Sequence, residues 1–531
     1  MAITFDPSAM IVLDAALEVP LFRQIYEQIR GHVLAKRLLP GRRLPSTRVL
    51  AARLGVSRTS VSAAYEQLMA EGYLEGRAGS GTFVSAHLPD DLAGHIARPG
   101  GVPTGSQTPL PTGEEFLSTR GQLLAALRPP KPAARQDLAP GLADLREFPF
   151  ALWARLLRRS WRRPAAQIAA SHDPAGYGDL RQVIADYLSR ERGVIAHRDQ
   201  VMIVSGAQQA IQLAAHALTD VGQKVLVEDP GYDGVRGALL GAGLQLVSVP
   251  VDDQGLDITS YAAAHDGAKL VCVAPSNQYP LGVTMSLPRR LALLDWAQAQ
   301  QAWIIEDDYD SEFRYDGRPL AALQGLDNAR RVLYIGSFSK VMFPSLRLGY
   351  LVLPSNLVAA FRSLRGALDD HPSMLAQQAL HDFFVEGHFA AHLRRMRRAY
   401  SLRRQAMVMA LKADLPDYLE VASVQAGMHL VAFLRPSTGL RDVAVVAAAE
   451  QLGLSLIAIS PLYRRQPARQ GLLIGFAAAH ETDIPALVSR LAAAIKAAAG
   501  ATLNGRKQGL SAAVKIGPDE TVLGPQSDGR H

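Results

Sequence analysis

The pattern of apolar and polar positions separates a short helical segment from a long alternating one. Between Pro20 and Ser85, apolar residues recur at helical spacing in "PLFRQIYEQIRGHVLAK", "STRVLAARLG" and "SRTSVSAAYEQLMAEGY". Ser46 and Ser57 stand where N-caps are expected, and Gly55 stands where the second helix should end. The next stretch, "YLEGRAGSGTFVS", has two short apolar runs around a glycine-rich turn. The pattern predicts three helices followed by a β-hairpin.

A second, much longer segment, residues 137 to 500, alternates helical patterns with short apolar runs. The runs that predict buried strands are "QVMIVSG", "KVLVEDP", "KLVCVAPS", "AWIIEDDY", "RVLYIGS" and "RLGYLVLP". Strands that alternate with helices at this interval predict a large α/β domain with a mostly parallel sheet. Each run ends in polar or glycine residues, and parallel sheets carry their ligand sites at these carboxyl ends.

The remaining segments lack a periodic apolar pattern. Residues 86 to 136 are rich in proline and glycine, as in "ARPGGVPTGSQTPLPTG", and predict a linker. Within it, "EEFLSTRGQLLAALR" predicts one short helix. Residues 501 to 531 predict a disordered tail. We therefore expect a small α/β domain at residues 1 to 85 and a large α/β domain at residues 137 to 500.

Composition narrows the class of protein. A chain of 531 residues is too long to fold around a single hydrophobic core, so two or more domains are expected. Its residues are 48% hydrophobic and 20% charged, which is the composition of a globular protein. The single cysteine, Cys272, excludes an internal disulfide framework and fits a reducing compartment. The N-terminal stretch lacks the features of a secretory signal, and no apolar run approaches the roughly 20 residues that span a bilayer. These features predict a cytoplasmic protein without a membrane partner, and no metal site is predicted.

Charge is concentrated in the N-terminal segment. The formal net charge of the chain is +7, yet residues 20 to 85 alone carry ten basic and only four acidic side chains. A small basic segment on a nearly balanced body points to a polyanionic partner. Charge alone fits a solvated helical face as well, so the interpretation depends on how the helices are arranged.

The second and third predicted helices are joined by "LGV" and form a helix-turn-helix, and the hairpin after them forms a wing. The N-terminus of the third helix should face the major groove of DNA, where Arg58 suits a bidentate contact to guanine. The glycine-rich turn beside Arg77 should let the wing approach a minor groove. A helical module that binds protein is the alternative. The expected contacts to double-stranded DNA are Thr47, Arg48, Ser57, Arg58, Thr59, Ser60 and Gly81.

Groups at three predicted strand ends suit a phosphorylated planar ligand. In "SGAQQAI", the backbone N–H groups of Gly206, Ala207 and Gln208 open a helix and suit an anion. Tyr232 in "EDPGYDGVR" can stack on a ring, and Asn277 in "APSNQYPLG" can hydrogen-bond a ligand oxygen. Alone, each motif has a more ordinary explanation, such as a βα turn or a half-buried core aromatic side chain.

The stretch "GSFSKVMFPSLRLGY" places charged groups between two buried strands, where an unpaired charge is costly. Ser337, Ser339 and Arg347 suit a phosphate dianion. A partly desolvated lysine has a lowered pKa and suits nucleophilic attack on an aldehyde, which is the role expected of Lys340.

The strand that leads into "IIEDDYDSEFRY" directs Asp307 and Tyr309 to the same face, because side chains alternate along a strand. Asp307 can keep a pyridine nitrogen protonated, and Tyr309, together with Asn277, can hydrogen-bond a phenolate oxygen. Combined with Lys340, the aromatic lid and the phosphate groups, these residues describe a site for pyridoxal 5′-phosphate.

Both segments resemble known families. The stretch "LPSTRVLAARLGVSRTSVSAAYEQLMAEGYLEGRAGSGTFV" resembles the winged helix-turn-helix of the GntR family. Residues 137 to 498 resemble fold-type I, class I/II aminotransferases through "GYGDLRQVIADYLSRERGV", "SGAQQAI", "EDPGY", "EDDYDSEFRY" and "SFSKVMFPSLRLGY". Their fusion in this order is similar to the MocR/GabR family of transcriptional regulators. The resemblance implies a homodimer that reads paired DNA half-sites, with Lys340 as the Schiff-base lysine, Asp307 at the pyridine nitrogen, Tyr309 near the ring hydroxyl and Tyr232 over the ring.

One position departs from the aminotransferase pattern. Aminotransferases carry a C-terminal arginine that grips the substrate carboxylate, whereas this chain has Leu473, in "QGLLIGFAAAH", at about that position. Arg464, Arg465 and Arg469 lie shortly upstream of Leu473, and Arg236 follows Tyr232 by four positions, so another arginine could serve instead. The effector could therefore be an amine without a carboxylate, a sulfonate, or pyridoxal phosphate itself.

The combined prediction is a transcriptional regulator that binds pyridoxal 5′-phosphate through Lys340 and senses an amino compound or the cofactor itself. The effector's amine would displace Lys340 without any need for net catalysis. The rival hypothesis is a catalytically active aminotransferase with an accessory N-terminal domain, which the lost carboxylate arginine disfavours. A third hypothesis, an interaction protein with two relic sites, is disfavoured by the intact Lys340 and Asp307.

Overall fold

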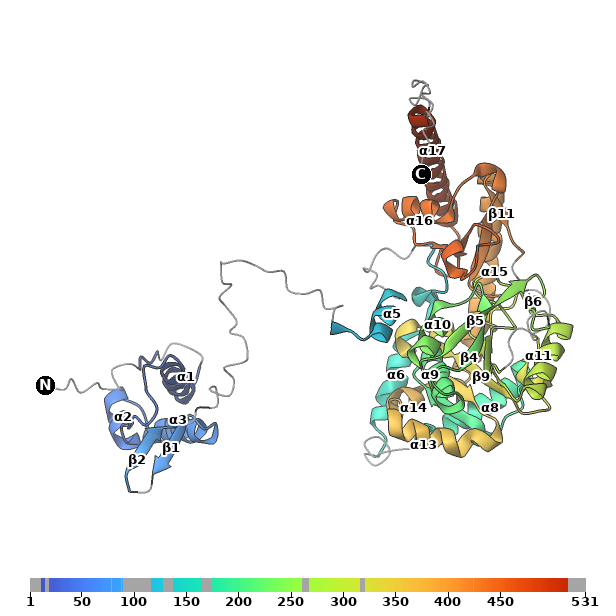
Figure 1. Ribbon diagram of the computed structural model, residues 1–531. Coiled ribbons are helices and arrows are strands. Elements are labelled where there is room, and N and C mark those ends of the chain that lie inside the picture. The colour runs from blue at the N-terminus through green and yellow to red at the C-terminus, as the bar shows by residue number, and fades with distance from the viewer. Residues whose placement is uncertain are drawn as a thin grey trace, which may run out of the picture. The chain divides into compact units, whose positions relative to one another are not determined.

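The computed structural model describes residues 11–14, 19–77, 79–86, 88, 116–127, 137–164, 173–259, 267–315, 320–423 and 425–513. The chain divides into two compact units, Met1–Thr112 and Gly113–His531, and each is described by itself (Figure 1). Most of the predicted linker, and the part of the predicted tail that follows Ala513, lie outside the described residues.

The N-terminal unit consists of three helices and an antiparallel hairpin, which confirms the predicted order of elements. Ser46 caps the second helix by accepting a hydrogen bond from the Val49 N–H, and Gly55 ends it in the left-handed conformation. The buried Tyr65 donates a hydrogen bond to the Pro45 carbonyl oxygen over 3.0 Å, which holds the third helix against the turn before the second. The elements are α1 (Leu21–Leu34), α2 (Thr47–Leu54), α3 (Arg58–Ala70), β1 (Leu74–Arg77) and β2 (Gly81–Val84).

The second unit is built on an eight-stranded sheet with the order β3-β10-β9-β8-β7-β4-β5-β6. Strands β5, β4, β7, β8 and β9 are parallel to their neighbours in this series, and β10 is antiparallel to both β9 and β3. All six predicted strands are present, β5 and β6 are additional, and the mostly parallel architecture is confirmed. The strands are β3 (Val201–Val204), β4 (Lys224–Asp229), β5 (Gln245–Asp252), β6 (Gly255–Leu256), β7 (Leu270–Val273), β8 (Trp303–Asp308), β9 (Val332–Ser337) and β10 (Gly349–Val352).

Helices cover both faces of this sheet and give the unit three layers. Helices α9, α10 and α13 pack on one face, and α8, α14 and α11 pack on the other, each through a cluster of buried apolar side chains. Because both faces are covered, the strands are continuous apolar runs rather than alternating ones. The helices are α6 (Phe150–Trp161), α8 (Gly178–Arg192), α9 (Ala207–Leu218), α10 (Asp233–Gly241), α11 (Leu287–Ala299), α12 (Phe338–Val341), α13 (Val358–Leu368) and α14 (Met374–Val385).

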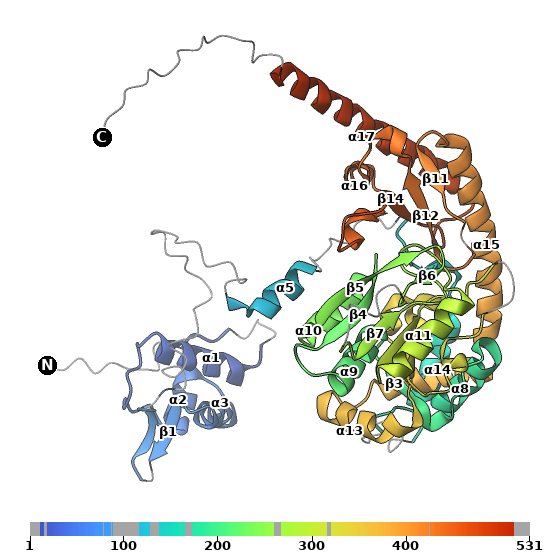
Figure 2. The same ribbon diagram turned by 45° about the vertical axis from the view of Figure 1, so that its right-hand side comes forward.

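The C-terminal part forms a second sheet, with the antiparallel order β11-β12-β14-β13, which the sequence did not predict. Strand β11 has three residues and β13 has two, so neither leaves a recognisable pattern. The long helix α15 runs alongside the unit from the large sheet to the small one (Figure 2). The elements are α15 (His388–Asp414), β11 (Leu419–Val421), β12 (His429–Leu434), α16 (Asp442–Gln451), β13 (Ile457–Ala458), β14 (Gly471–Gly475) and α17 (Ile484–Ala513).

Two boundaries differ from the prediction. The short helix expected within the linker is present as α5 (Thr119–Leu127), but it packs on α10 of the second unit, where Leu124 lies over Gly241. The independent part of the linker is therefore shorter than predicted. Helix α17 continues to Ala513, into the first residues of the segment for which a disordered tail is predicted. Alanine, leucine, lysine, arginine and glutamine in this stretch favour a helix without an apolar stripe.

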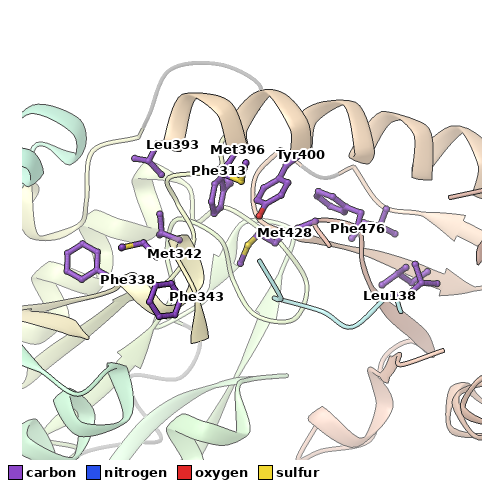
Figure 3. Packing of buried hydrophobic residues seen from close by; sticks show 14 of the residues in the cluster. Leu138, Phe313, Phe338, Met342, Phe343, Leu393, Met396, Tyr400, Met428 and Phe476 are labelled. Atoms are coloured by element: carbon purple, nitrogen blue, oxygen red, sulfur yellow. The ribbon is translucent and has the colours of Figure 1, made fainter. Parts of the chain in front are cut away.

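Residues 137–144, which we call the strap, bridge the small sheet and the turn after β9. The Leu138 carbonyl oxygen accepts a hydrogen bond from the Gly475 N–H over 2.8 Å, and the Asp137 carbonyl accepts one from the Ser455 N–H. A Cβ on Gly475 would lie 2.1 Å from the Ala139 carbonyl oxygen, so this approach requires glycine. Figure 3 shows Leu138 in the same buried cluster as Phe338, Met342, Phe343, Met428 and Phe476.

Candidate cofactor cavity and nucleic-acid interface

A cavity of about 430 Å³ opens at the carboxyl ends of the parallel strands β4, β7, β8 and β9. This is the edge of the sheet at which the sequence predicted a ligand site. The volume falls within the range of small-molecule and cofactor sites. The predicted residues that line the cavity are Ala207, Gln208, Tyr232, Asp307, Tyr309, Ser337, Ser339, Lys340 and Arg347.

Lys340 lies on α12, the single helical turn that follows β9. The Ser337 side chain caps this turn by accepting a hydrogen bond from the Ser339 N–H. The Nζ of Lys340 donates a hydrogen bond to the Gly141 carbonyl oxygen over 3.1 Å, and Gly141 itself lines the cavity. The reactive amine is therefore held between the large sheet and the strap.

Another part of the cavity lining combines the cation of Arg347 with the N-terminus of helix α9. The guanidinium group of Arg347 lies over Gly206, the residue before α9, where a Cβ would come 3.3 Å from Arg347 Nη2. Gly206 has φ +108°, a conformation that favours glycine. The missing side chain at Gly234 leaves room for the Tyr232 ring and the Gln208 amide. A cation beside the first N–H groups of α9 suits a phosphate.

Asp307, the last residue but one of β8, has one carboxylate oxygen that makes no hydrogen bond within the described residues. Its Oδ1 is shielded from solvent, and burial raises the pKa of the Asp307 carboxyl to about 7, with a further increase from the charge of Asp308. Asp308 points away from the cavity, where Arg192 pairs with it at 2.7 Å and the Tyr334 hydroxyl donates to it. These partners hold the end of β8 so that Asp307 faces the cavity.

Two residues that were predicted to contact the ligand, Asn277 and Gly206, are not among the residues that line the cavity. The Nδ2 of Asn277 donates to the Tyr309 hydroxyl over 3.3 Å and to Asp310 Oδ1 over 2.8 Å. Asn277 is buried, and its contact with Tyr309 orients the hydroxyl of that side chain. Gly206 lies against the guanidinium group of Arg347. The direct ligand contacts expected of Asn277 and of the Gly206 N–H stay predictions.

The N-terminal unit presents the start of α3 and the tip of the hairpin to solvent. Gly81 is exposed with φ +109°, and a Cβ there would lie 3.1 Å from the Nε of Arg43, an arginine that the sequence did not assign to DNA. Of the other predicted contacts, Arg48, Ser57, Arg58 and Thr59 are exposed, and Thr47 and Ser60 are half-buried.

Two side chains of this surface also make contacts within the unit, and the first confirms a predicted N-cap. The Ser57 hydroxyl accepts a hydrogen bond from the Ser60 N–H and lies 2.9 Å from the Ser60 hydroxyl, so it serves as the N-cap of α3. Arg77 on the wing pairs with Glu75 at 2.6 Å and lies over the Phe83 ring. Its charge is therefore already offset, whereas the charges at the start of α3 are exposed.

Both units match known families. Residues 21–84 match the family of bacterial regulatory proteins named gntR, and residues 153–491 match aminotransferase class I and II. The chain is 40% identical over 470 residues to the probable rhizopine catabolism regulatory protein MocR of Rhizobium meliloti, which covers 88% of this chain and 92% of that protein. The chain belongs to the MocR-type regulators of the GntR family.

Two further comparisons extend this assignment. The MocR-type regulator is 33% identical over 460 residues to the HTH-type pyridoxine biosynthesis transcriptional regulator PdxR of Corynebacterium glutamicum, with 87% of this chain and 92% of that protein covered. The structure of LysN, an alpha-aminoadipate aminotransferase from Thermus thermophilus complexed with N-(5′-phosphopyridoxyl)-L-leucine, matches with TM-score 0.64 and 25% identity over 73% of this chain and 98% of that one. The predicted family, fold and regulator class are confirmed, and pyridoxal 5′-phosphate is the cofactor of the aminotransferase-like domain.

The cavity of this MocR-type regulator offers matching groups for that cofactor. Gln208 Nε2, Asp307 Oδ1 and Ser339 Oγ are buried and make no hydrogen bond within the described residues. Unpartnered buried polar atoms are rare and call for an explanation. A carboxylate suits a protonated pyridine nitrogen, and a hydroxyl and an amide beside Arg347 suit a phosphate. The residues present therefore fit pyridoxal 5′-phosphate.

Sequence reasoning missed several cavity-lining residues of the MocR-type regulator. Glu228 directly precedes "DPGY" and Tyr279 follows Asn277 by two positions, so the strand-end argument could have found both. Burial raises the pKa of Glu228 to about 8. Gly141 and His429 come from the strap and from β12, and no local motif marks them.

Across the ranges that the structure describes, the MocR-type regulator has no helix long and apolar enough to cross a membrane. Within the same ranges, no group of three or more His, Cys, Asp or Glu side chains is arranged to hold a metal ion.

Proposed function

We propose that this regulator holds pyridoxal 5′-phosphate at Lys340 and changes its affinity for double-stranded DNA when an amino compound, or the cofactor itself, occupies the cavity. One observation carries the proposal. The amine of Lys340, an unpartnered carboxylate oxygen of Asp307 and the guanidinium group of Arg347 line one cavity, and the same chain exposes the start of α3, the helix expected to enter the major groove. When bound, the cofactor supplies an aldehyde that captures amines and a ring that withdraws electrons.

Each part of the cofactor has a group to hold it. Asp307 would accept a hydrogen bond from the ring nitrogen, and Tyr309, oriented by Asn277, would donate one to the ring oxygen. Tyr232 would lie over the ring. The groups expected around the phosphate are the N–H groups at the start of α9 and the side chains of Gln208, Ser337, Ser339 and Arg347.

Asp307 is suited to hold a proton near neutral pH. Burial raises the pKa of its carboxyl to about 7, and the charge of Lys340 opposes this increase. A protonated ring nitrogen beside Asp307 would add a second positive charge and favour the ionised carboxylate. The carboxylate would in turn keep the ring nitrogen protonated.

The signal would start at the Lys340 amine. Lys340 would hold the cofactor through its amine, and an effector's amine would compete with Lys340 for the same carbon of the cofactor. Wherever the effector's amine prevails, Lys340 would be a free amine, and the exchange requires neither an oxidant nor a reductant. The released amine can then donate to the Gly141 carbonyl oxygen, as it does in the described structure.

The strap provides a route from Lys340 toward the linker. Gly141 contacts Lys340, and Asp137, at the other end of the strap, pairs with Arg490 of α17 at 3.1 Å. Asp144 pairs with Arg403 of α15 at 2.9 Å. The strap directly follows the linker in the chain. A change at Lys340 would therefore shift the equilibrium between two conformations of the regulator that differ in their affinity for DNA, and allosteric control depends on such an equilibrium.

A homodimer would pair two DNA-binding units for two half-sites. Apolar side chains on and just before α6 support this expectation, since Leu145, Phe150 and Trp161 are 46%, 45% and 64% exposed in the single chain. Large exposed apolar side chains suit a protein partner, and we expect a second copy of this chain to cover them.

Hydride trapping of the purified full-length protein tests the proposal. Borohydride reduction should leave a phosphopyridoxyl adduct on the Lys340 peptide and on no other, and Lys340→Ala should abolish it. Lys224→Ala, at an exposed lysine outside the cavity, is the matched control. Affinity for a duplex selected from random sequence should respond to added amines in the wild type and not in Lys340→Ala. Absence of the adduct would overturn the proposal.

A catalytically active aminotransferase remains the second candidate, because the cavity keeps Lys340, Asp307 and Arg347 together. Conversion of an amino donor to its oxo product over many turnovers would favour this candidate. Binding that changes DNA affinity without turnover would favour the sensor.

A further inference from the structure

The cavity wall formed by the small sheet is apolar at the position where aminotransferases carry their carboxylate-binding arginine. Leu473 pairs with Val431 and with Ile457, so the three residues share a sheet face with His429, two positions before Val431. His429 and Ile457 line the cavity. An arginine at position 473 would therefore lie on the cavity-facing side, where the leucine instead packs with Val431.

Two of the arginines that could replace the missing one, Arg236 and Arg469, already have acidic partners. Arg236 lines the cavity, but its guanidinium group lies 3.1 Å from Asp233 and 3.6 Å from Asp229. Arg469 pairs with Glu420 at 2.7 Å, away from the cavity. Two carboxylates thus balance Arg236, and a third negative charge from a ligand would gain little there. On this wall an effector carboxylate would therefore find no arginine at position 473 and only an already paired one at position 236, and a poorly paired charge is costly in a buried site.

His429 is the polar exception on this wall. Its side chain is buried, its Nδ1 makes no hydrogen bond within the described residues, and its ring meets the Tyr279 ring edge-on at 5.8 Å. Burial and the charge of Lys340 lower the pKa of His429 to about 3, so the imidazole is neutral at physiological pH. A neutral imidazole carries one donor and one acceptor and matches a hydroxyl group, which offers both.

We propose that His429 determines effector specificity by binding a hydroxyl group, so that the effector is an amino alcohol without a carboxylate on the carbon that bears its amine. This inference rests on the proposed function, because it places the effector's amine at Lys340. The unpartnered Nδ1, the apolar surface around Leu473 and the balanced charge of Arg236 all favour a neutral, hydroxyl-bearing tail.

Three small amines test the inference on the cofactor-loaded wild-type protein. Serinol carries two hydroxymethyl groups, serine replaces one of them by a carboxylate, and isopropylamine lacks both hydroxyls. The apparent Kd of each is read from the absorption change of the bound cofactor. We expect serinol to bind at least about tenfold more tightly than serine, since the carboxylate finds no cation. Serine binding as tightly as serinol, or equally weak binding of all three amines, would overturn the inference.

Variants of His429 separate specific recognition from general effects of the amines. His429→Phe keeps a ring against Tyr279 but removes both hydrogen-bonding atoms, and it should reduce the serinol preference over isopropylamine by about tenfold. Comparing this ratio between variant and wild type cancels the different basicities of the amines. His429→Asn, which keeps a donor and an acceptor, should retain part of the preference. An unchanged ratio in His429→Phe would overturn the assignment of His429.

The same experiment distinguishes failure of the inference from failure of the proposed function. Hydride trapping of Lys340 without any amine reports cofactor binding alone. An adduct on Lys340 combined with no serinol preference would leave the sensor proposal standing and remove only the role of His429. Should His429→Phe fail to retain the cofactor, the wild-type comparison of the three amines and the His429→Asn variant still decide the question.

Discussion

The amine of Lys340 donates a hydrogen bond to the carbonyl oxygen of Gly141, 3.1 Å away and 199 positions earlier in the chain. The group that captures the cofactor is therefore in contact with the strap, the first described segment after α5. The strap is itself held against β14 at Gly475 and against α17 at Arg490. A change in the bonding of Lys340 acts directly on this segment.

Gly475→Ala should displace the strap, because the new Cβ would lie 2.1 Å from the Ala139 carbonyl oxygen. We expect the free energy of unfolding to fall by about 1–3 kcal/mol and the DNA response to added amines to weaken. Gly500→Ala is the matched control, since a Cβ there meets no atom within 4 Å. Denaturant unfolding and DNA titration measure the two effects. A full DNA response in Gly475→Ala would contradict the role of the strap.

Asp307→Asn should change how the stability of the cofactor-free protein depends on pH. The pKa of Asp307 is about 7 in the folded protein, above that of the unfolded chain. The folded state thus holds this proton more tightly, and the resulting stability is present at low pH and lost as the pH rises from about 4 to about 7. Asp307→Asn should remove that loss and stabilise the cofactor-free protein by roughly 2–4 kcal/mol at pH 8. Chemical unfolding at pH 5 and pH 8 checks this, and parallel pH profiles for variant and wild type would refute it.

Arg347→Ala should weaken the binding of pyridoxal 5′-phosphate by about 10- to 100-fold, because a charge-assisted contact to the phosphate is lost. Binding of pyridoxal, which has no phosphate, should change little and serves as the control ligand. Equilibrium dialysis of the cofactor-free protein with each ligand measures both affinities. Equal losses for the two ligands would show that Arg347 supports the cavity as a whole.

Arg58→Ala should weaken operator binding by about 1–3 kcal/mol if the exposed guanidinium group contacts a base. Arg23→Ala is the control, because Arg23 pairs with Glu27 on α1 at 2.9 Å and its charge is already offset. Fluorescence anisotropy with a selected duplex, repeated over a range of salt concentrations, measures both the affinity and its salt dependence. Equal affinities for Arg58→Ala and the wild type would place the recognition surface elsewhere.

The elements that sequence patterns predicted are those with strong local signals. Each of these elements has a pattern that can be recognised within about ten residues of sequence. They are the capped helices α2 and α3 and the apolar strands β3, β4 and β7 to β10. The small sheet escaped prediction because β11 and β13 have only three and two residues, too few for a recognisable alternation of apolar and polar positions. Its strands are specified by tertiary contacts more than by their own sequences.

The residues of the cavity likewise divide into those that local sequence patterns predicted and those that only the folded chain brings there. Lys340, Asp307 and Arg347 follow strands or turns whose local pattern placed them at one edge of the sheet. Gly141 and His429 reach the cavity only because the strap and β12 fold back onto that edge.

The sequence by itself determined the two-domain plan, the recognition helix and the chemical identity of the cofactor groups, because those features are encoded in local periodicity and in motifs at strand ends. Only the tertiary structure decided which backbone meets the reactive amine, which arginines are already neutralised, and that a lone imidazole remains unpartnered on an apolar wall. Such facts depend on contacts between residues hundreds of positions apart, whose distances and charge balance exist only once the chain has folded.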